Sequence, residues 1–162
     1  MSIDTVRADL AEQGFTGAIL EFSESSATVE LAATQAGTDP ERIAKTLAFA
    51  STTDVPGAIL VVAAGDAKVN GGMFKREFRG KPRMLKADEV EPLTGHPVGG
   101  VCPFANPDEA RIYLDASLAR FKTVFPAAGS ANSAVELTLE QLEDLSGALG
   151  WVDVCTGWRE EA

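Results

Sequence analysis

Residues 58–64 read AILVVAA, the longest unbroken apolar run in the chain. A run without alternation is typical of a strand that is buried on both faces of a sheet. It is far shorter than the roughly 20 residues that a membrane-spanning helix requires. The stretch before it, residues 43–49, reads IAKTLAF, which fits a helix or a strand whose odd-numbered residues, Lys45 among them, share one face. We favour the strand, because 58–64 then becomes its buried neighbour across the turn-like linker 51–57.

Helical and extended segments alternate irregularly on both sides of this pair. The predicted helices have capping residues or terminal glycines and span residues 2–13, 28–36, 70–78, 88–94 and 138–149. The further predicted strands span residues 18–22, 83–86, 111–115, 123–125, 134–137 and 151–155. Several strands follow one another without a helix between them, which favours a mixed sheet over a doubly wound parallel one. We therefore predict a single α/β (α+β) domain over residues 1–162.

The composition is that of a globular protein, with 45% hydrophobic and 23% charged residues. Fourteen Lys and Arg stand against 24 Asp and Glu, which gives a net charge of −10. Such a chain is repelled by nucleic acids and anionic lipids unless basic residues gather locally. The first residues show no basic start followed by an apolar stretch, so we expect no secretory signal and no membrane association.

Cysteine and histidine are too sparse for metal or disulfide chemistry. Cys102 and Cys155 lie far apart in sequence, and the only histidine is His96. Two reduced thiols are typical of a cytoplasmic protein, and a zinc site needs clustered ligands that this chain lacks. His96 precedes Pro97 in a glycine-rich stretch, so an ordinary loop residue is the simpler interpretation. We expect no metal and no cofactor.

Lys45 is the first candidate for a functional residue. If residues 43–49 form a strand, its ammonium lies in an apolar stripe, which is costly unless a partner satisfies it. It would then be a cation at the floor of a pocket that binds an anionic or carbonyl-bearing ligand. The alternative is that the segment is helical or that the lysine extends to solvent.

Two small-residue loops are the next candidates. Residues 99–104 read GGVCPF, and paired glycines allow backbone N–H groups to converge on a carbonyl, oxyanion or phosphate. Residues 127–132 read AAGSAN, which leaves room for a ligand. Asp115 could orient either loop, or it could cap the turn that contains Ser117. Either glycine stretch could also be an ordinary tight loop.

Positive charge is concentrated in residues 75–86, which read KREFRGKPRMLK and carry a net charge of +5, against −15 for the rest of the chain. A local basic segment on an acidic protein is what binding to a phosphate backbone requires. The alternative is a solvated face whose cations pair with nearby acids. The candidate phosphate-binding cations are Lys75, Arg76, Arg79, Lys81, Arg83 and Lys86, and we call residues 75–86 the basic segment.

The order of these motifs resembles that of the YbaK family, which includes the editing insertion domain of bacterial prolyl-tRNA synthetases and the free-standing ProX proteins. The resemblance covers nearly the whole chain. It rests on Thr28-Val29-Glu30 with Ala32-Ala33, Ile43-x-Lys45-Thr46-Leu47, Thr94-Gly95, Gly99-Gly100-Val101-x-Pro103, Leu114-Asp115-x-Ser117-Leu118 and Ala128-Gly129-x-x-Asn132.

The resemblance implies a mixed, curved, barrel-like sheet surrounded by helices, and hydrolysis of the ester that joins a wrong amino acid to tRNA without a metal or cofactor. Lys45 is then the catalytic residue, and we expect its side chain to point toward the glycine loop at residues 99–103. The specificity positions of the family fall on Thr46 and on Val101-Cys102, which do not single out Ala, Cys, Ser or Thr as the substrate. The predicted substrate-binding residues are Thr46, Gly99, Gly100, Val101, Cys102, Pro103, Phe104, Asp115, Gly129 and Ser130.

Together, these observations predict a trans-editing aminoacyl-tRNA deacylase. The loop N–H groups stabilise the tetrahedral oxyanion, and Lys45 acts as a cation rather than as a base, since no neighbouring cation in sequence would lower its pKa by the roughly three units required. The partner is a mischarged tRNA, which we expect to dock through the tRNA-binding cations of the basic segment on the same side as the Lys45 pocket. An aminoacyl-tRNA synthetase is left open as a second partner. The alternatives are a non-catalytic tRNA- or nucleotide-binding module and an adaptor that binds a synthetase.

Overall fold

A computed structural model of the chain describes residues 2–25 and 28–158. The α-helices are α1 (Ser2–Glu12), α2 (Val29–Ala36), α3 (Gly71–Phe78), α4 (Ala87–Thr94) and α5 (Leu139–Ser146), and two 3-10 helices are η1 (Pro40–Arg42) and η2 (Ala116–Arg120). The strands are β1 (Ile19–Glu21), β2 (Ile43–Phe49), β3 (Ile59–Ala64), β4 (Lys68–Val69), β5 (Arg111–Asp115), β6 (Thr123–Pro126), β7 (Ser133–Val135), β8 (Leu137–Thr138), β9 (Gly150–Val152) and β10 (Cys155–Thr156).

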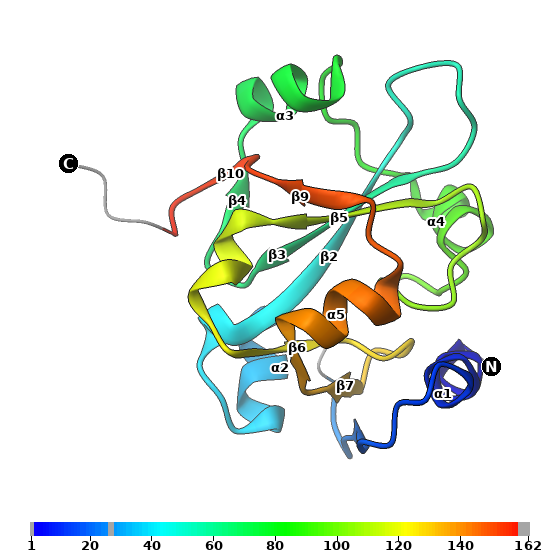
Figure 1. Ribbon diagram of the computed structural model, residues 1–162, viewed down its shortest axis with the longest axis vertical. Coiled ribbons are helices and arrows are strands. Elements are labelled where there is room, and N and C mark those ends of the chain that lie inside the picture. The colour runs from blue at the N-terminus through cyan, green and yellow to red at the C-terminus, as the bar shows by residue number, and fades with distance from the viewer. Residues whose placement is uncertain (1, 26–27, 159–162) are drawn as a thin grey trace.

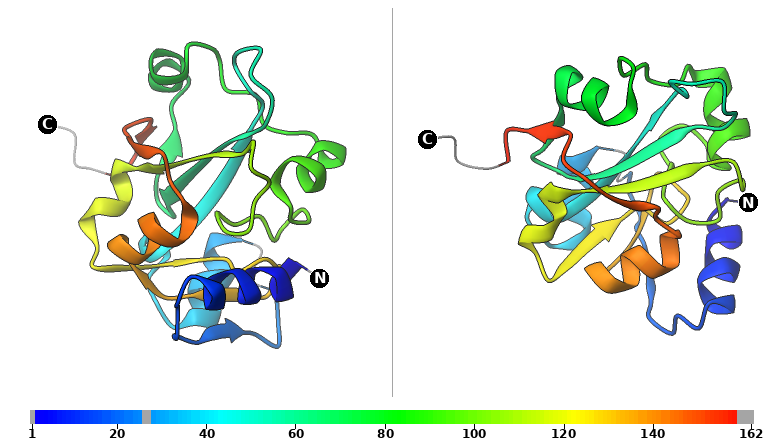
Figure 2. Two further views of the ribbon diagram at one scale, coloured as in Figure 1. Left: turned by 45° about the vertical axis from the view of Figure 1, so that its right-hand side comes forward. Right: turned by 45° about the horizontal axis from the view of Figure 1, so that its top comes forward.

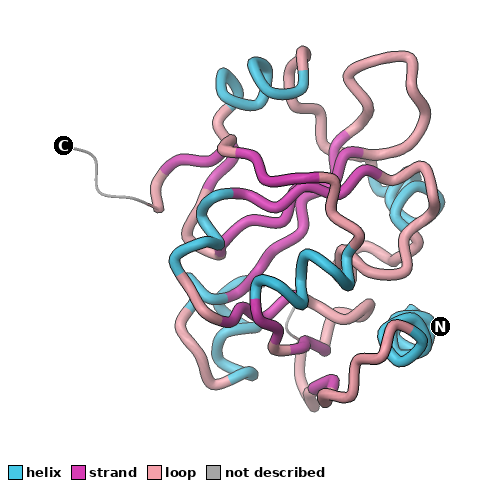
Figure 3. Tube along the Cα trace, in the orientation of Figure 1, coloured by secondary structure: helices cyan, strands magenta, loops and turns pink. Residues whose placement is uncertain are grey.

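The main sheet has six strands in the order β8-β6-β2-β3-β5-β9. It is mixed, because β2 is antiparallel to β3 and parallel to β6, while β5 runs parallel to both of its neighbours. Two short antiparallel pairs, β1–β7 and β4–β10, complete the sheet structure. The sheet curls into a half-barrel with helices around it (Figures 1 and 3), which confirms the predicted fold class.

The β2–β3 pair lies at the centre of this sheet and confirms the interpretation of both stretches that opened the sequence analysis. Every residue of β3 is buried, as expected for a strand covered on both faces. An aromatic chain then attaches α3 to the sheet: the ring centroids of Phe49 and Phe74 are 4.8 Å apart, those of Phe74 and Phe78 4.6 Å, and those of Phe78 and Tyr113 5.0 Å. Each such pair contributes about 0.5–1.5 kcal/mol beyond burial.

The helix predicted over residues 138–149 is shorter than expected. Its capping box is present, since Thr138 accepts from the Gln141 N–H at 3.1 Å and Gln141 accepts in return at 2.9 Å. The helix ends at Ser146 because Gly147 adopts a left-handed conformation with φ of 67°. Leu149, which the predicted helix included, lies beyond its end and is 63% exposed.

Several short strands also differ from the prediction. The segment 83–86 makes only an isolated bridge between Phe49 and Met84. The predicted strands 134–137 and 151–155 are each divided in two, because their halves pair with different strands. Strand β4 was missed, since two residues carry no periodic signal. No helix within residues 2–25 and 28–158 has the length and apolar character to cross a membrane.

Candidate active site

A cavity of about 200 Å³ opens between α2, the first half of β2, the ends of β6 and β7, and the loop that follows α4. It brings together four of the predicted residues, Lys45, Thr46, Gly99 and Val101, and its walls are otherwise mostly small and apolar. The lining residues are Thr28, Val29, Ala32, Ile43, Ala44, Lys45, Thr46, Gly99, Val101, Phe125, Ala127, Ser133 and Ala134.

Lys45 lies on β2 as predicted, and its side chain is half-buried at the cavity wall. Its ammonium donates to the carbonyl oxygen of Ala67 and, at 3.4 Å, to that of Gly65. Burial lowers the pKa of the Lys45 ammonium, while Cys155 and the Asp66 carboxylate act in the opposite direction. Carbonyl acceptors favour the protonated form, so the arrangement supports a cation. The ammonium contacts the turn after β3, whereas we expected it to point toward the glycine loop.

The two glycine loops pack against each other. Gly99 has a φ of 88°, a conformation that favours glycine. A Cβ on Gly100 would lie 2.9 Å from the Cα of Ser130, so a side chain there would push the loops apart. The Gly100 N–H donates within its own loop to Pro97 O at 2.9 Å. The cavity-lining members of this loop, Gly99 and Val101, therefore remain the candidates for contact with a ligand.

The second half of that loop lies behind the cavity. Cys102, Pro103 and Phe104 are buried and do not line it. The Cys102 Sγ is 3.4 Å from His96 Nε2, which in turn lies 2.6 Å from Phe104 O. Burial raises the pKa of Cys102 to about 12, and burial also lowers the pKa of His96. The thiol therefore stays protonated near neutral pH and is not an activated nucleophile.

We expect Cys102→Ser and His96→Ala each to keep deacylation within about tenfold of the wild-type rate. Both side chains are fully buried, and neither lines the cavity. The measurement is single-turnover deacylation with soluble, folded variants. Inactivation by a thiol-alkylating reagent that Cys102→Ser abolishes would show instead that this cysteine is a nucleophile.

Asp115 and Ser130 lie outside the cavity lining. The buried Asp115 carboxylate accepts from the N–H groups of Ser117 and Val154, both at 2.9 Å. It thus caps the 3-10 helix η2, the alternative that the sequence left open. The Ser130 hydroxyl bonds to the Oγ of Ser133 at 2.7 Å, and Ser133 does line the cavity.

Thr46 offers a free polar group at the cavity. Its hydroxyl oxygen is buried and has no hydrogen-bond partner among the residues that the structure describes. A buried hydroxyl without a partner costs free energy, and a ligand with a donor or acceptor could satisfy it. Most of the cavity residues that sequence reasoning missed lie on or beside α2, β6 and β7, and two more, Ile43 and Ala44, lie on β2. Their contribution depends on how these elements meet.

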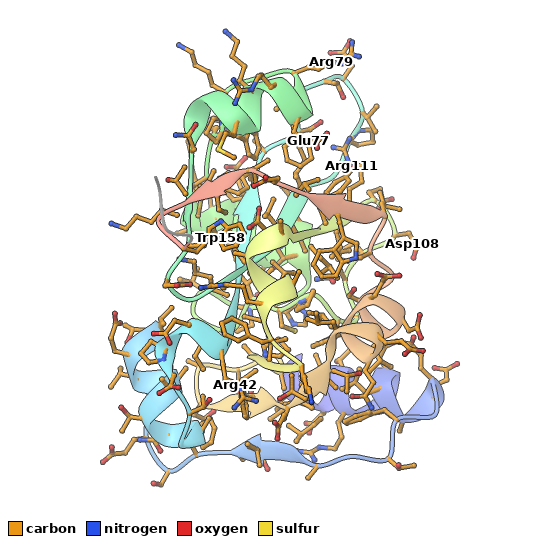
Figure 4. All side chains as sticks on the ribbon, turned by 60° about the vertical axis from the view of Figure 1, so that its left-hand side comes forward. Arg42, Glu77, Arg79, Asp108, Arg111 and Trp158 are labelled. Carbon is orange, nitrogen blue, oxygen red and sulfur yellow. The ribbon has the colours of Figure 1, made fainter. Side chains whose placement is uncertain are left out.

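The basic segment lies away from the cavity. All six of its cations are exposed. Arg83 pairs with Glu89 at 3.2 Å, and no other cation of the segment has an ion pair in the described residues. Helix α3 lies at one end of the long axis, and α2 lies at the other (Figures 1 and 2). Figure 4 likewise places Arg79 opposite Arg42, the residue before β2. We expected the segment on the same side as Lys45, and the structure does not place it there.

The chain belongs to the aminoacyl-tRNA editing domain family, whose model matches residues 23–145. This membership confirms the resemblance to the YbaK family and implies hydrolase activity on an aminoacyl-tRNA. Among the described residues, no three His, Cys, Asp or Glu side chains gather as metal ligands would.

Relatives of known sequence or structure match along nearly their whole length. The chain is 47% identical to the uncharacterized protein YwhH of Bacillus subtilis (strain 168), over 98% of this chain and 99% of that one. The solved structure of a candidate trans-editing enzyme for prolyl-tRNA synthetase is similar with a TM-score of 0.85 and 29% identity, over 96% and 98% of the two chains. The hypothetical protein APE2540 is similar with a TM-score of 0.82 and 31% identity, over 94% and 99%.

Proposed function

We propose that this protein is a trans-editing deacylase that hydrolyses the ester of a tRNA mischarged with a small amino acid. The observation that carries the proposal is the half-buried Lys45 ammonium at the wall of a small, largely apolar cavity. Family membership supports the reaction class. Structural similarity to a candidate trans-editing enzyme, over 96% of this chain and 98% of that one, supports action in trans. The tRNA substrate makes the cytoplasm the proposed site of action.

The chemistry requires little from the protein, because an aminoacyl ester is already activated. Water adds to the ester carbonyl carbon, and the tetrahedral oxyanion is stabilised by the Lys45 ammonium and by the N–H groups of Gly99 and Val101. The bond to the ribose oxygen then breaks, and the water proton passes to that oxygen. The products are the free amino acid and the tRNA 3′ end. Preorganised donors of this kind each contribute roughly 3 kcal/mol.

The size and lining of the cavity support a small amino acid such as Ala, Cys, Ser or Thr. Val29, Ala32 and Ala134 limit the space, while the Thr46 hydroxyl can bond to a polar side chain or to the α-amino group. One methylene in such a site discriminates by only about 10–200-fold. We therefore expect measurable hydrolysis of more than one small aminoacyl-tRNA.

The proposal is tested by a deacylation assay across a panel of tRNAs charged with Ala, Cys, Ser, Thr and a bulky control such as Phe. We expect turnover of at least one small aminoacyl-tRNA and none of the bulky one. Tight binding without turnover would instead indicate a non-catalytic tRNA- or nucleotide-binding module. Binding to a prolyl-tRNA synthetase without either effect would indicate an adaptor.

We also propose that the basic segment contacts tRNA phosphates away from the reacting ester. Arg76→Glu with Arg79→Glu should raise KM for full-length tRNA roughly tenfold, since two exposed contacts of about 0.7 kcal/mol each are lost. Hydrolysis of a minimal aminoacyl-adenosine should barely change. Each lost contact should also reduce the steepness of the plot of log binding constant against log salt concentration by about 0.7.

The matched control is Arg7→Glu with Lys122→Glu, which changes the net charge equally at exposed positions outside the basic segment. The measurement is the ratio of kcat/KM for the two substrates. If both double variants change that ratio equally, only net charge matters. If neither changes it, the basic segment is a solvated face.

A further inference from the structure

The turn that holds Lys45 is itself held from outside the cavity. Residues 64–67 form a tight turn in which the Ala67 N–H donates to Ala64 O at 3.0 Å. A Cβ on Gly65 would lie only 2.0 Å from Pro40 O, so this turn fits closely against η1. On the other side, the Ala64 N–H donates to the Ser117 hydroxyl at 3.0 Å. The turn therefore presents the Gly65 and Ala67 carbonyl groups to the Lys45 ammonium from a fixed position.

Arg120 fixes the exposed corner of that turn. Its guanidinium binds both carboxylate oxygens of Asp66, at 2.6 and 3.0 Å, and each side chain of the pair is only 28% exposed. A bidentate Arg–carboxylate pair constrains orientation as well as distance. Asp66 is the residue between the two carbonyl groups that accept from Lys45.

Arg120 is in turn held by four further contacts, two hydrogen bonds and two contacts with aromatic rings. Its Nε donates to Ser117 O at 2.9 Å, and its Nη1 donates to Trp158 O at 3.0 Å. The guanidinium also lies over two rings, 4.7 Å from the centroid of Phe121 and 5.1 Å from that of Trp158. Trp158, labelled in Figure 4, lies beyond the residues that the family model matches. This chain thus reinforces the turn with a segment outside the matched domain.

From this geometry we infer that Arg120 is a positioning residue for the reaction: by clamping Asp66, it holds the turn whose carbonyl groups place the Lys45 ammonium at the cavity. The inference rests on the proposed function, because it assigns Lys45 the role of the oxyanion-stabilising cation. Without the Arg120–Asp66 pair, the turn loses its attachment, so the Gly65 and Ala67 carbonyl groups shift and carry the Lys45 ammonium away from the ester. A displacement of this kind costs rate rather than affinity, since an ammonium misplaced by about 1 Å can cost a hundredfold.

The experiment compares Arg120→Met, Arg120→Lys and the control Arg111→Met, another half-buried arginine that donates to a hydroxyl, Ser51 Oγ, at 2.9 Å. Arg120→Met should lower kcat roughly ten- to a hundredfold with KM nearly unchanged. Arg120→Lys should lower kcat less than Arg120→Met does, because lysine keeps the positive charge but not the bidentate geometry. Arg111→Met should leave both parameters within about twofold of the wild type.

A double-mutant cycle with Lys45→Ala separates positioning from general stability. If Arg120 acts through Lys45, then Arg120→Met should have no further effect in the Lys45→Ala background. An equal loss in both backgrounds, or a kcat unchanged in Arg120→Met while Lys45→Ala is inactive, overturns the inference. If Lys45→Ala alone is fully active, the proposed mechanism fails first and independently of Arg120.

A second variant tests the Arg120–Asp66 pair independently, should Arg120→Met fail to fold. Asp66→Asn keeps the shape of the side chain and removes the charge that Arg120 binds. It should lower kcat in the same direction while the thermal midpoint stays close to that of the wild type. A wild-type kcat in Asp66→Asn would also overturn the inference, because the clamp would then have no role in the reaction.

Discussion

Lys45→Ala is expected to reduce deacylation roughly a hundredfold or more while leaving the protein folded. In the proposed mechanism the variant loses a donor to the oxyanion, and such a loss costs about 10²–10³ in comparable sites. The fold should tolerate the change, because the remaining wall of the cavity is small and apolar. The measurement is single-turnover deacylation on the preferred tRNA from the panel, together with a thermal unfolding curve for each variant.

Lys68→Ala is the matched control for this prediction, since Lys68 is an exposed cation on the short strand β4. It should retain near-wild-type activity. The pH profile adds a further readout: because burial lowers the pKa of Lys45, the cation is lost as pH rises through a value below that of an ordinary lysine. The enzymatic rate, corrected for spontaneous hydrolysis, should therefore fall at alkaline pH. Near-wild-type rates in Lys45→Ala would refute the proposed role of Lys45.

Asp115→Ala is expected to destabilise the protein by about 3 kcal/mol, since it leaves two buried N–H groups without acceptors at about 1–3 kcal/mol each. The groups are those of Ser117 and Val154, so η2 and the chain after β9 lose their shared attachment. That loss is a large share of a typical folding free energy of about 5–15 kcal/mol. Urea unfolding should show the lower midpoint directly.

Asp115→Asn is the corresponding control, because its amide retains one acceptor oxygen and should cost less than the alanine variant. Enzymatic activity distinguishes the two roles that the sequence left open. If Asp115 is a structural cap, the folded fraction of either variant should keep its kcat and KM. Unchanged stability with a raised KM would instead indicate that Asp115 binds the substrate, as the sequence analysis predicted.

The strands at the centre of the fold could be predicted from sequence because one of them carries a clear signal. The run 58–64 is apolar throughout, and the ambiguous stretch 43–49 was interpreted as a strand because 58–64 then became its buried neighbour. The ends of elements were harder. Leu149 fitted the helical spacing, but Gly147 ended the helix before it. Strand β4 depends on pairing with β10, some 85 residues later, and no local pattern encodes that contact.

The candidate site was predictable only in part for a similar reason. Lys45, Thr46 and Gly99 belong to motifs that a sequence displays, and the structure brings them together at one cavity. Asp115 belongs to a motif as well, but its carboxylate faces backbone N–H groups. The contact between Cys102 and His96 depends on the conformation of the loop that both residues share. The clamp on Asp66 joins two segments that lie far apart in sequence, so spacing along the chain predicted neither contact.

The separation of α2 and α3 along the molecule (Figure 1) has a consequence for how such a protein can diversify. Substitutions that do not share partners usually have additive free energies. If the proposed function holds, a lineage could therefore exchange residues around the cavity to accept another amino acid while keeping the basic segment. It could equally change the charges of α3 to bind a different tRNA without altering the cavity. Protein engineers can use the same independence, treating the two ends as separately adjustable parts of one small scaffold.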